Sequence, residues 1–317
     1  MVMGTKGNHR IAVAIAVFLL VAVLAAADPC GAAENVIGVI MSGDIPYYND
    51  LHKAFLSRLT QLGIAADTEV VVQKPYPDKI SLINAARKLI AMDVDAIVVY
   101  GAPAAVATVA EKSKVPVVYA SVYEPFATEV KTRYSTGVYV RLSVSSLLRY
   151  LKSLTQVNTL GVVYNSNEED SVYQYGELSK LAAQQGLKIE GFNLKRHQEA
   201  KAKLSGRKVD AILLTGSAVA QMAMPQISEY AREQRIPYAS FFLSRDSRSL
   251  IALAASPDEQ GEKTAEKTKK ILEGVPPEKI RPEASKEVEL VFNLKDATAM
   301  GLKLSMELVT EATKLIK

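Results

Sequence analysis

Six short segments carry polar or aromatic side chains, or the turn residues glycine and proline, directly after apolar stretches of strand-like composition. The first, residues 42–48 (SGDIPYY), combines a hydroxyl, a carboxylate and two rings beside one expected helix start. Groups of this kind recognise small molecules by hydrogen bonding and ring contacts. The candidate ligand contacts in the six segments are Ser42, Asp44, Pro46, Tyr47, Gly101, Ala102, Pro103, Ala104, Ser121, Tyr123, Glu124, Asn165, Ser171, Ser217 and Phe241.

Residues 101–104 (GAPA) are predicted to begin a helix after a buried strand, because Pro103 suits the first helical position. The N–H groups of a first helical turn lack intrahelical partners, and the helix dipole adds positive potential. Such a turn can hold a ligand carboxylate without an arginine. In the alternative interpretation, Gly101 and Pro103 are ordinary turn residues.

Two other segments contain carboxylates. We expect Glu124 to accept a hydrogen bond from a ligand amine, while Tyr123 stacks on an apolar group. In residues 165–171 (NSNEEDS), Ser171 is expected to be a helix N-cap. Residues 168–170 are interpreted as a solvated acidic loop rather than a site for a hard cation.

The sequence contains none of the common catalytic or metal-binding signatures. It has no G-x-S-x-G elbow, no Walker loop, no G-x-G-x-x-G and no His/Cys cluster with metal spacing. His52 and His197 lie in charge-rich helical segments, where a solvated surface role is expected. We therefore predict a binding protein that is not an enzyme and that needs neither a cofactor nor a metal ion.

The candidate segments must be positioned by a repeating α/β pattern, since short β-branched runs alternate with segments of helical period. A proline inside the last helix of the second half, Pro225, predicts a break near Met224. Strands are predicted at residues 36–41, 68–73, 96–100, 116–120, 136–140, 159–164, 188–193, 211–215, 237–239, 250–254 and 288–292. Helices are predicted at residues 49–62, 79–92, 103–112, 143–154, 171–185, 218–232 and 258–272, with a short helix after residue 197 and a terminal helical region.

This order predicts two Rossmann-like lobes with parallel sheets, joined by a hinge of three crossovers. In open parallel sheets a ligand lies at the carboxyl ends of the strands, so the six segments are expected to face one another across a cleft. The first lobe is predicted to contain residues 34–140 plus 256–285. The second is predicted to contain residues 141–255 plus 286–317.

The N-terminus has the pattern of an export signal. Lys6 and Arg10 precede an uninterrupted apolar run, residues 11–27, and small residues before Asp28 or before Glu34 offer cleavage sites. We prefer cleavage before Glu34, which makes residues 1–33 a signal peptide and places the mature protein in the periplasm. Pro29 disfavours lipid attachment at Cys30, and the apolar run falls short of the ~20 residues that an uncleaved anchor needs.

The remaining charges are mixed in sign along the expected helices, and the net charge of the full chain is +4. This pattern does not predict a nucleic-acid partner. Cleavage before Glu34 removes the single cysteine, so no disulfide is expected. A monomer is predicted.

Several short segments of the sequence resemble those of the ABC-transporter substrate-binding proteins, in the group that includes tryptophan- and tyrosine-binding members. The resemblance covers residues 36–302 and is carried by VDAIVVYGAPAAVA, VPVVYASVYEP, LGVVYNSNEEDS, KVDAILLTGSAV, RIPYASF and ELVFNLKDATAMGL. It implies the type I periplasmic-binding-protein architecture, capture of a small ligand and delivery to the membrane permease of an ABC importer. The pocket residues that it implies are Asp44, Pro46, Ala102, Pro103, Ala104, Ser121, Glu124, Asn165, Ser171, Ser217 and Phe241.

Three departures from the family pattern leave the ligand open. Ala102 replaces a usual threonine, Glu124 stands where the family has an aspartate before proline, and Gly216–Ser217 replaces a polar pair. We expect an amino-acid-like or aromatic carboxylate ligand. A periplasmic sensor that feeds a membrane receptor kinase or cyclase remains the alternative function.

Overall fold

The computed structural model describes residues 34–125, 129–243 and 249–317. The chain divides into two units, Met1–Glu34 and Asn35–Lys317, and the second contains all of the helices and strands below. The predicted signal peptide, residues 1–33, lies outside the described residues. Within the described ranges, no helix has both the length and the apolar character that crossing a membrane requires.

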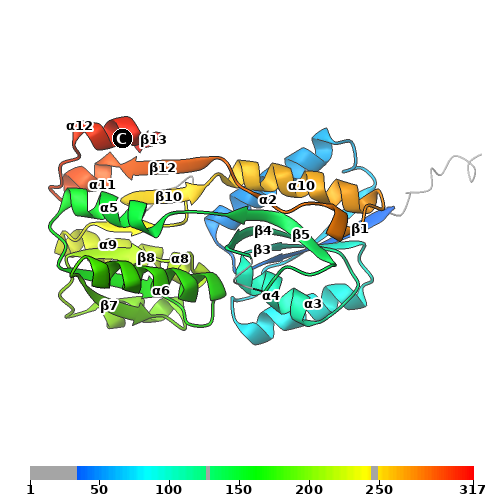
Figure 1. Cartoon of the computed structure of the whole chain (residues 1–317), viewed down its shortest axis with the longest axis horizontal. Coiled ribbons are helices and arrows are strands. Elements are labelled where there is room, and N and C mark those ends of the chain that lie inside the picture. Colours follow the sequence, from blue (N-terminus) through cyan, green and yellow to red (C-terminus); the bar gives the residue numbers. More distant parts are fainter. Residues whose placement is uncertain (1–33, 126–128, 244–248) are drawn as a thin grey trace, which may run out of the picture. The chain divides into compact units, whose positions relative to one another are not determined.

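Five strands from the first half of the second unit and β11 from its C-terminal part form a six-stranded sheet in the order β11-β5-β4-β3-β1-β2, in which the paired strands are parallel (Figure 1). β3 (Ala96–Tyr100) is buried along its whole length, which suits a continuous apolar run covered on both faces. The other strands are β1 (Asn35–Met41), β2 (Thr68–Gln73), β4 (Val117–Tyr123), β5 (Ser135–Val140) and β11 (Glu283–Ala284).

Helices cover both faces of this sheet, and we call the assembly the first lobe. α2 (Pro46–Gln61) and α10 (Pro257–Leu272) share one hydrophobic core, whereas α3 (Lys79–Ala91) and α4 (Ala102–Ala110) share another. α2 and α10 pack very closely at Gly261, where an added Cβ would lie 2.4 Å from the backbone oxygen of Leu51. Only glycine permits this approach.

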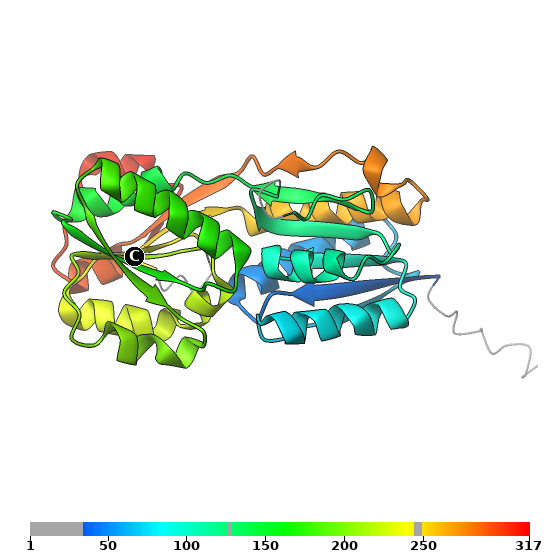
Figure 2. The ribbon, with the colours of Figure 1, turned by 60° about the horizontal axis from the view of Figure 1, so that its bottom comes forward.

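The second lobe contains a seven-stranded sheet in the order β13-β12-β10-β9-β8-β6-β7, in which only β12 runs antiparallel to its neighbour β10 among the described pairs. Its strands are β6 (Thr159–Tyr164), β7 (Lys188–Asn193), β8 (Ala211–Leu214), β9 (Tyr238–Ser240), β10 (Ile251–Ala255), β12 (Val288–Asn293) and β13 (Lys314–Ile316). Figure 2 shows this sheet between layers of helices. The helices are α5 (Val144–Leu154), α6 (Glu169–Gln184), α7 (Ala200–Leu204), α8 (Ala218–Met222), α9 (Met224–Gln234), α11 (Leu294–Ala299) and α12 (Met306–Glu311).

The described chain passes between the two sheets three times: after β5, after β10 and after β11. The carboxylate of Glu259, on α10, holds the third crossing, because it accepts hydrogen bonds from Ser285 Oγ and from the backbone N–H groups of Lys286 (2.9 Å) and Glu287 (2.7 Å). Burial raises the pKa of Glu259, but these bonds and Lys263 Nζ at 2.6 Å outweigh it and lower the pKa to about 2. The second and third crossings are thereby tied together.

Most predicted elements are present, and the predicted break is confirmed: α8 ends at Met222 and α9 begins at Met224. Several details of the prediction were wrong, including the start of α2 and the assignment of the terminal region. α2 begins at Pro46, three residues before the predicted start, because proline occupies the first helical position. The terminal region, predicted to be helical, also contains β13, which pairs with β12. The predicted lobe boundaries stay a prediction.

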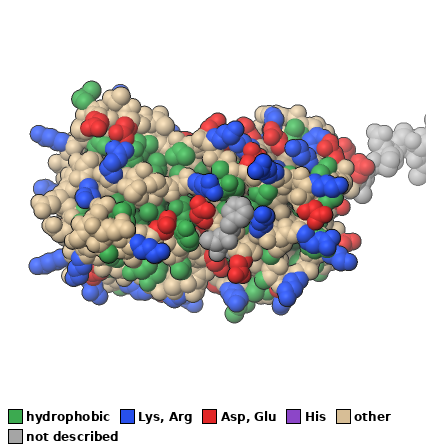
Figure 3. Space-filling model, viewed as in Figure 1, with side chains coloured by type: hydrophobic (Ala, Val, Ile, Leu, Met, Phe, Trp, Pro, Cys, Tyr) green, Lys and Arg blue, Asp and Glu red, His purple; other side chains and the backbone are tan. Residues whose placement is uncertain are grey.

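The surface carries charges of both signs. On the face drawn in Figure 3, lysine and arginine side chains are interspersed with aspartate and glutamate side chains. Several of the described ion pairs are exposed, such as that between Lys74 and Asp44 at 3.2 Å. Exposed pairs of this kind stabilise a fold only slightly.

Candidate ligand-binding site

Loops at the carboxyl ends of both sheets meet around a small cleft. This cleft has a volume of about 20 Å³, which is enough for roughly one water molecule. A ligand larger than water therefore requires the facing loops to move apart. The cleft is lined by Tyr47, Ser121, Tyr123, Val140, Leu142, Asp170, Gln174, Gly216, Phe241, Phe242 and Ala255.

The structure distributes the predicted contacts over four kinds of position. Tyr47, Ser121, Tyr123 and Phe241 line the cleft. The members that are buried and do not line the cleft are Ser42, Gly101, Ala102, Ala104, Asn165, Ser171 and Ser217. Pro103 lines a separate groove. The remaining three lie at the periphery: Pro46 is exposed, Asp44 bonds Lys74, and Glu124 faces Arg141 at 3.5 Å.

The start of α4 is already engaged by protein groups. Ser42 Oγ accepts the backbone N–H of Ala104 at 2.9 Å, and the backbone N–H of Ala102 faces the carboxylate of Asp170 and acts to lower its pKa. Gly101 has φ 88°, and a Cβ there would lie 2.3 Å from Tyr48 Oη. Both of these N–H groups in the first turn of α4 therefore already face a protein oxygen.

The carboxyl end of β4 is distorted, and its backbone bonds two polar side chains, Gln260 from α10 and Asp170 from α6. Ser121 has φ 56° beside an irregularity in the pairing with β5, and its N–H donates to Gln260 Oε1 at 2.9 Å. The N–H of Tyr123 donates to Asp170 Oδ2 at 3.0 Å. Within the described part of the chain, Asp170 Oδ1 and Gln260 Nε2 are buried without a hydrogen-bond partner. The two side chains bonded to this strand end thus keep one unused acceptor and one unused donor.

The acidic run at the start of α6 is buried, so the expectation of a solvated loop was wrong. Glu168 is 1% exposed and Asp170 is 5% exposed. Glu168 accepts hydrogen bonds from Ser217 Oγ (2.7 Å), Ala218 N (2.6 Å) and Val219 N (3.1 Å), and so caps α8. Helix N-terminal N–H groups stabilise buried carboxylates in this way.

Burial dominates the electrostatics of these two acids. It raises the pKa of Glu168 to about 7, against the hydrogen bonds from Ser217, Val219 and Ala218. It raises the pKa of Asp170 well above its usual range, although the N–H groups of Tyr123 and Ala102 oppose the shift.

Ser171 is not an N-cap, contrary to the prediction. α6 begins two residues earlier, at Glu169, and Ser171 lies within its first turn. Its Oγ accepts the N–H of Asn165 at 2.9 Å and lies 2.7 Å from Thr215 Oγ1. Ser171 therefore joins the loops after β6 and β8.

Aromatic side chains from both lobes pack beside the cleft. Tyr47 and Tyr48 lie 5.1 and 5.7 Å from Phe242, measured between ring centroids. The nearby His52 is half-buried with Nδ1 3.0 Å from Tyr100 Oη, and burial lowers its pKa to about 4. The expected solvated position was therefore wrong for His52.

Replacing Glu168 with glutamine is expected to flatten the dependence of stability on pH. Its folded pKa of about 7 exceeds the unfolded value of 4.5, so the folded state binds the proton more tightly. The free energy of unfolding should therefore fall as pH rises from 4.5 to 7, by on the order of 3 kcal/mol. Urea unfolding at several pH values measures this slope. The exposed control Glu229→Gln should leave the slope unchanged. An unchanged slope in Glu168→Gln as well would contradict the raised pKa assigned to Glu168.

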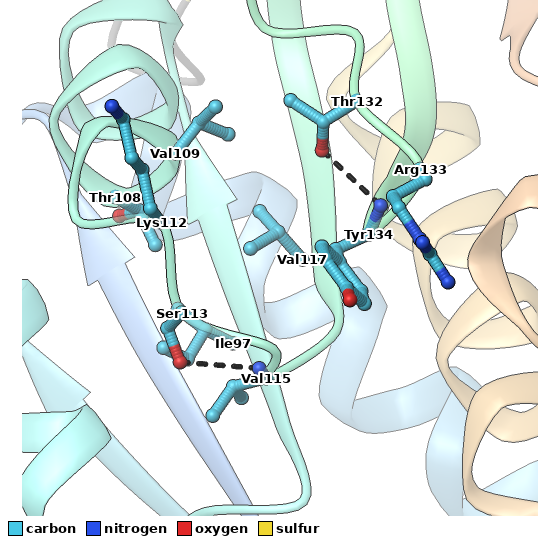
Figure 4. A pocket seen from close by; sticks show the side chains of 10 residues that line it. All are labelled: Ile97, Thr108, Val109, Lys112, Ser113, Val115, Val117, Thr132, Arg133 and Tyr134. Carbon is cyan, nitrogen blue, oxygen red and sulfur yellow. Dashed lines mark hydrogen bonds between the residues drawn. The ribbon is translucent and has the colours of Figure 1, made fainter.

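Two observations concern the rest of the described residues. A surface cavity of about 250 Å³ lies at the opposite edge of the first sheet, between the end of α4 and the start of β5 (Figure 4), and is lined by none of the predicted contacts. Its rim includes Lys112 and Arg133. Among the described residues, no cluster of histidine, cysteine or acidic side chains is suited to hold a metal ion.

Comparison with protein families gives a match over almost the whole described chain. Residues 37–316 match the model of the family described as ABC transporter substrate binding protein. No curated protein matches the sequence.

Solved structures share the fold. An ABC domain from Streptococcus pneumonia, solved in complex with L-Trp, is 21% identical with a TM-score of 0.82, over 89% of this chain and 100% of that one. A conserved domain protein from Vibrio cholerae is 21% identical with a TM-score of 0.83, over 89% and 99%. A solute binding protein from Bacillus halodurans with bound myo-inositol is 14% identical with a TM-score of 0.61, over 86% and 99%. These similarities confirm the predicted type I periplasmic-binding fold with two mostly parallel sheets.

Proposed function

Because this chain belongs to the ABC transporter substrate-binding proteins, we propose that it captures a small amino-acid-like solute between its two lobes and delivers it to the permease of an ABC importer. The observation that carries the ligand class is the pair of unused polar atoms at the end of β4. Asp170 Oδ1 is a hydrogen-bond acceptor and Gln260 Nε2 is a donor, and both are buried.

A zwitterion would satisfy both atoms. Its ammonium group would donate to Asp170 Oδ1, and its carboxylate would accept from Gln260 Nε2. Unpaired buried polar groups cost about 1–3 kcal/mol each, so the ligand that pairs them gains affinity. The rings of Tyr47, Tyr123 and Phe241 favour an apolar or aromatic body.

Ligand capture requires a hinge motion. The cleft holds only about 20 Å³, and Asp170 of the second lobe bonds the backbone of Tyr123 in the first. The ligand would enter when the lobes separate at the three crossings and would hold them together afterwards. We propose binding and release of the ligand without a catalytic step.

A thermal-shift screen of the exported chain tests the ligand class. L-amino acids with apolar or aromatic side chains should raise the melting temperature, since a ligand at a hundred times its Kd adds about 2.7 kcal/mol. The matched analogues that lack the amine, and those that lack the carboxylate, should shift it much less. Stabilisation by sugars or purines alone would overturn the proposal.

Location and partner are part of the same proposal. We place the protein in the periplasm as a monomer after cleavage before Glu34. N-terminal sequencing of the exported protein checks the cleavage site. Ligand-dependent stimulation of a reconstituted permease and its ATPase checks the transport role.

A further inference from the structure

A cavity of about 250 Å³ opens at the edge of the first sheet that lies opposite the cleft (Figure 4). We call it the amino-edge cavity, because its lining includes residues at the start of β3 and β4 and just before β5. Every lining residue belongs to the first lobe, so the cavity should keep its shape whether the cleft is open or closed. The lining is formed by Ile97, Thr108, Val109, Lys112, Ser113, Val115, Val117, Thr132, Arg133 and Tyr134.

The inside of the amino-edge cavity is largely apolar and has room for one ring. Ile97 and Val117 are buried at the start of their strands, and Val109 and Tyr134 are half-buried beside them. An apolar cavity of roughly 150 Å³ can hold a benzene molecule. The larger volume here therefore accommodates a compact aromatic body, whose burial against these side chains stabilises the complex.

Two cationic side chains lie at the rim, and no lining residue is acidic. Lys112, just after α4, is exposed and has no ion-pair partner among the described residues. Figure 4 shows Arg133 on the other side of the cavity, and its guanidinium carbon lies 4.9 Å from the centroid of the Tyr134 ring. Arg133 pairs with Glu278 only at 3.9 Å, and both side chains are more than half exposed, so the pair is weak. The rim therefore keeps a positive charge that the protein does not neutralise.

This combination of an apolar interior and a cationic rim selects for ligand charge. A carboxylate at the rim is attracted by both cations, whereas an ammonium group at the same position is repelled. A neutral ring gains the apolar contacts without the attraction. The zwitterion proposed for the cleft is disfavoured here, since the lining contains no carboxylate to pair with its ammonium group.

We propose that the amino-edge cavity binds a small aromatic carboxylate that carries no amine. Its ring lies against Ile97, Val117 and Tyr134, and its carboxylate group stays at the rim. Lys112 and Arg133 hold the carboxylate from opposite sides, because both have long side chains that can turn toward the opening. The proposal does not depend on the function proposed for the cleft.

Each rim charge should contribute a modest part of the affinity. Exposed charge pairs are weak, so Lys112→Gln and Arg133→Gln should each weaken benzoate binding about 3-fold, and the double variant about 10-fold. Salt should act in the same direction. At an ionic strength of about 1 M benzoate should bind several-fold more weakly, whereas binding of a neutral ring should not weaken.

The experiment is calorimetric titration of the exported chain with benzoate, benzyl alcohol and benzylammonium at neutral pH and low salt. Benzoate should bind about 10-fold more tightly than either of the other two. Reversing both charges, by combining Lys112→Glu with Arg133→Glu, should invert the preference, so that benzylammonium binds better than benzoate. Lys180→Gln, an exposed change on α6, is the matched control and should leave benzoate binding unchanged.

Each contrary outcome overturns the proposal: no binding of benzoate, equal binding of benzyl alcohol or benzylammonium, or an affinity that the double glutamine variant does not change. Asp170→Asn separates this cavity from the cleft and should leave benzoate binding unchanged. A benzoate affinity that responds to Asp170→Asn, and not to Lys112→Gln or Arg133→Gln, would place benzoate in the cleft and overturn the proposal. The cleft is tested independently, because the rim variants should keep amino-acid binding intact.

Discussion

Asp170→Asn is expected to weaken binding of the amino-acid-like ligand about 100-fold, which corresponds to about 2.7 kcal/mol. The substitution removes the charge that pairs with the ligand ammonium in a buried setting, where loss of one charged partner costs ~2–5 kcal/mol. The side-chain oxygen of asparagine can still accept the N–H of Tyr123, so the contact between the lobes is kept. Calorimetry with the amino acid found in the thermal-shift screen measures the change.

The same variant should not lose stability without ligand. Asp170 is 5% exposed, and its raised pKa shows that burial disfavours its charge. A neutral asparagine relieves that cost, so urea unfolding of the ligand-free variant should give an equal or higher free energy. Weak binding with undiminished stability distinguishes a ligand contact from a structural residue. Asp93→Asn, at an exposed position, is the control for both measurements.

The pH dependence of binding gives a second signature of Asp170. Its folded pKa lies above its usual range, and only the ionised form attracts an ammonium group. The affinity of the unsubstituted protein for its ligand should therefore rise as pH increases through that raised pKa. In Asp170→Asn this rise should be absent. Equal pH profiles and equal affinities for the two proteins would contradict the role of Asp170.

The fold could be predicted from the sequence because its strands are short and strongly apolar. β3 was predicted with its observed bounds, since AIVVY is a continuous apolar run between a helix end and a glycine. β13 was missed because its three residues, KLI, are too few to show an alternation of polar and apolar side chains. Its pairing with β12 also depends on residues outside its own segment. Local pattern identifies an element only when it is long enough to be periodic.

The site could be predicted only as a set of loops. Tyr47, Ser121, Tyr123 and Phe241 were identified because they follow the predicted strands, which indicates the edge of the sheet where they lie. Gln260 was missed because it lies within a charged helix and meets Ser121 across 139 positions of sequence. The burial of Asp170 was not predicted, because an acidic run is normally solvated. Here the starts of α4 and α8 face residues 168–170. Burial of a charge depends on tertiary partners that single-sequence patterns do not contain.

Gly261→Ala is expected to have the largest effect on stability, about 3 kcal/mol. An added Cβ would lie 2.4 Å from Leu51 O, 2.7 Å from Ala54 Cβ and 2.7 Å from Phe55 N. Two of these atoms belong to the backbone of α2, so the contact is relieved only if one helix moves. Overpacking of this kind costs ~1–3 kcal/mol or more, and it outweighs the ~1 kcal/mol that alanine gains in a helix.

Gly176→Ala is the matched control for this variant. Gly176 also lies inside a helix, α6, but its added Cβ meets nothing within 4 Å. Alanine there should raise the free energy of unfolding by about 1 kcal/mol, because only the helix preference acts. Urea unfolding of both variants separates the effect of close helix packing from that of losing a glycine.

The displacement of α10 in Gly261→Ala should also reach the cleft. Gln260 precedes Gly261 and donates its unused Nε2 to the proposed ligand, while Glu259 holds the third crossing between the lobes. Because the backbone of α2 cannot yield locally, both side chains should shift with α10. We therefore expect weaker ligand binding together with lower stability in Gly261→Ala, and neither in Gly176→Ala. A Gly261→Ala protein with full stability and full affinity would show that the α2–α10 packing does not position Gln260.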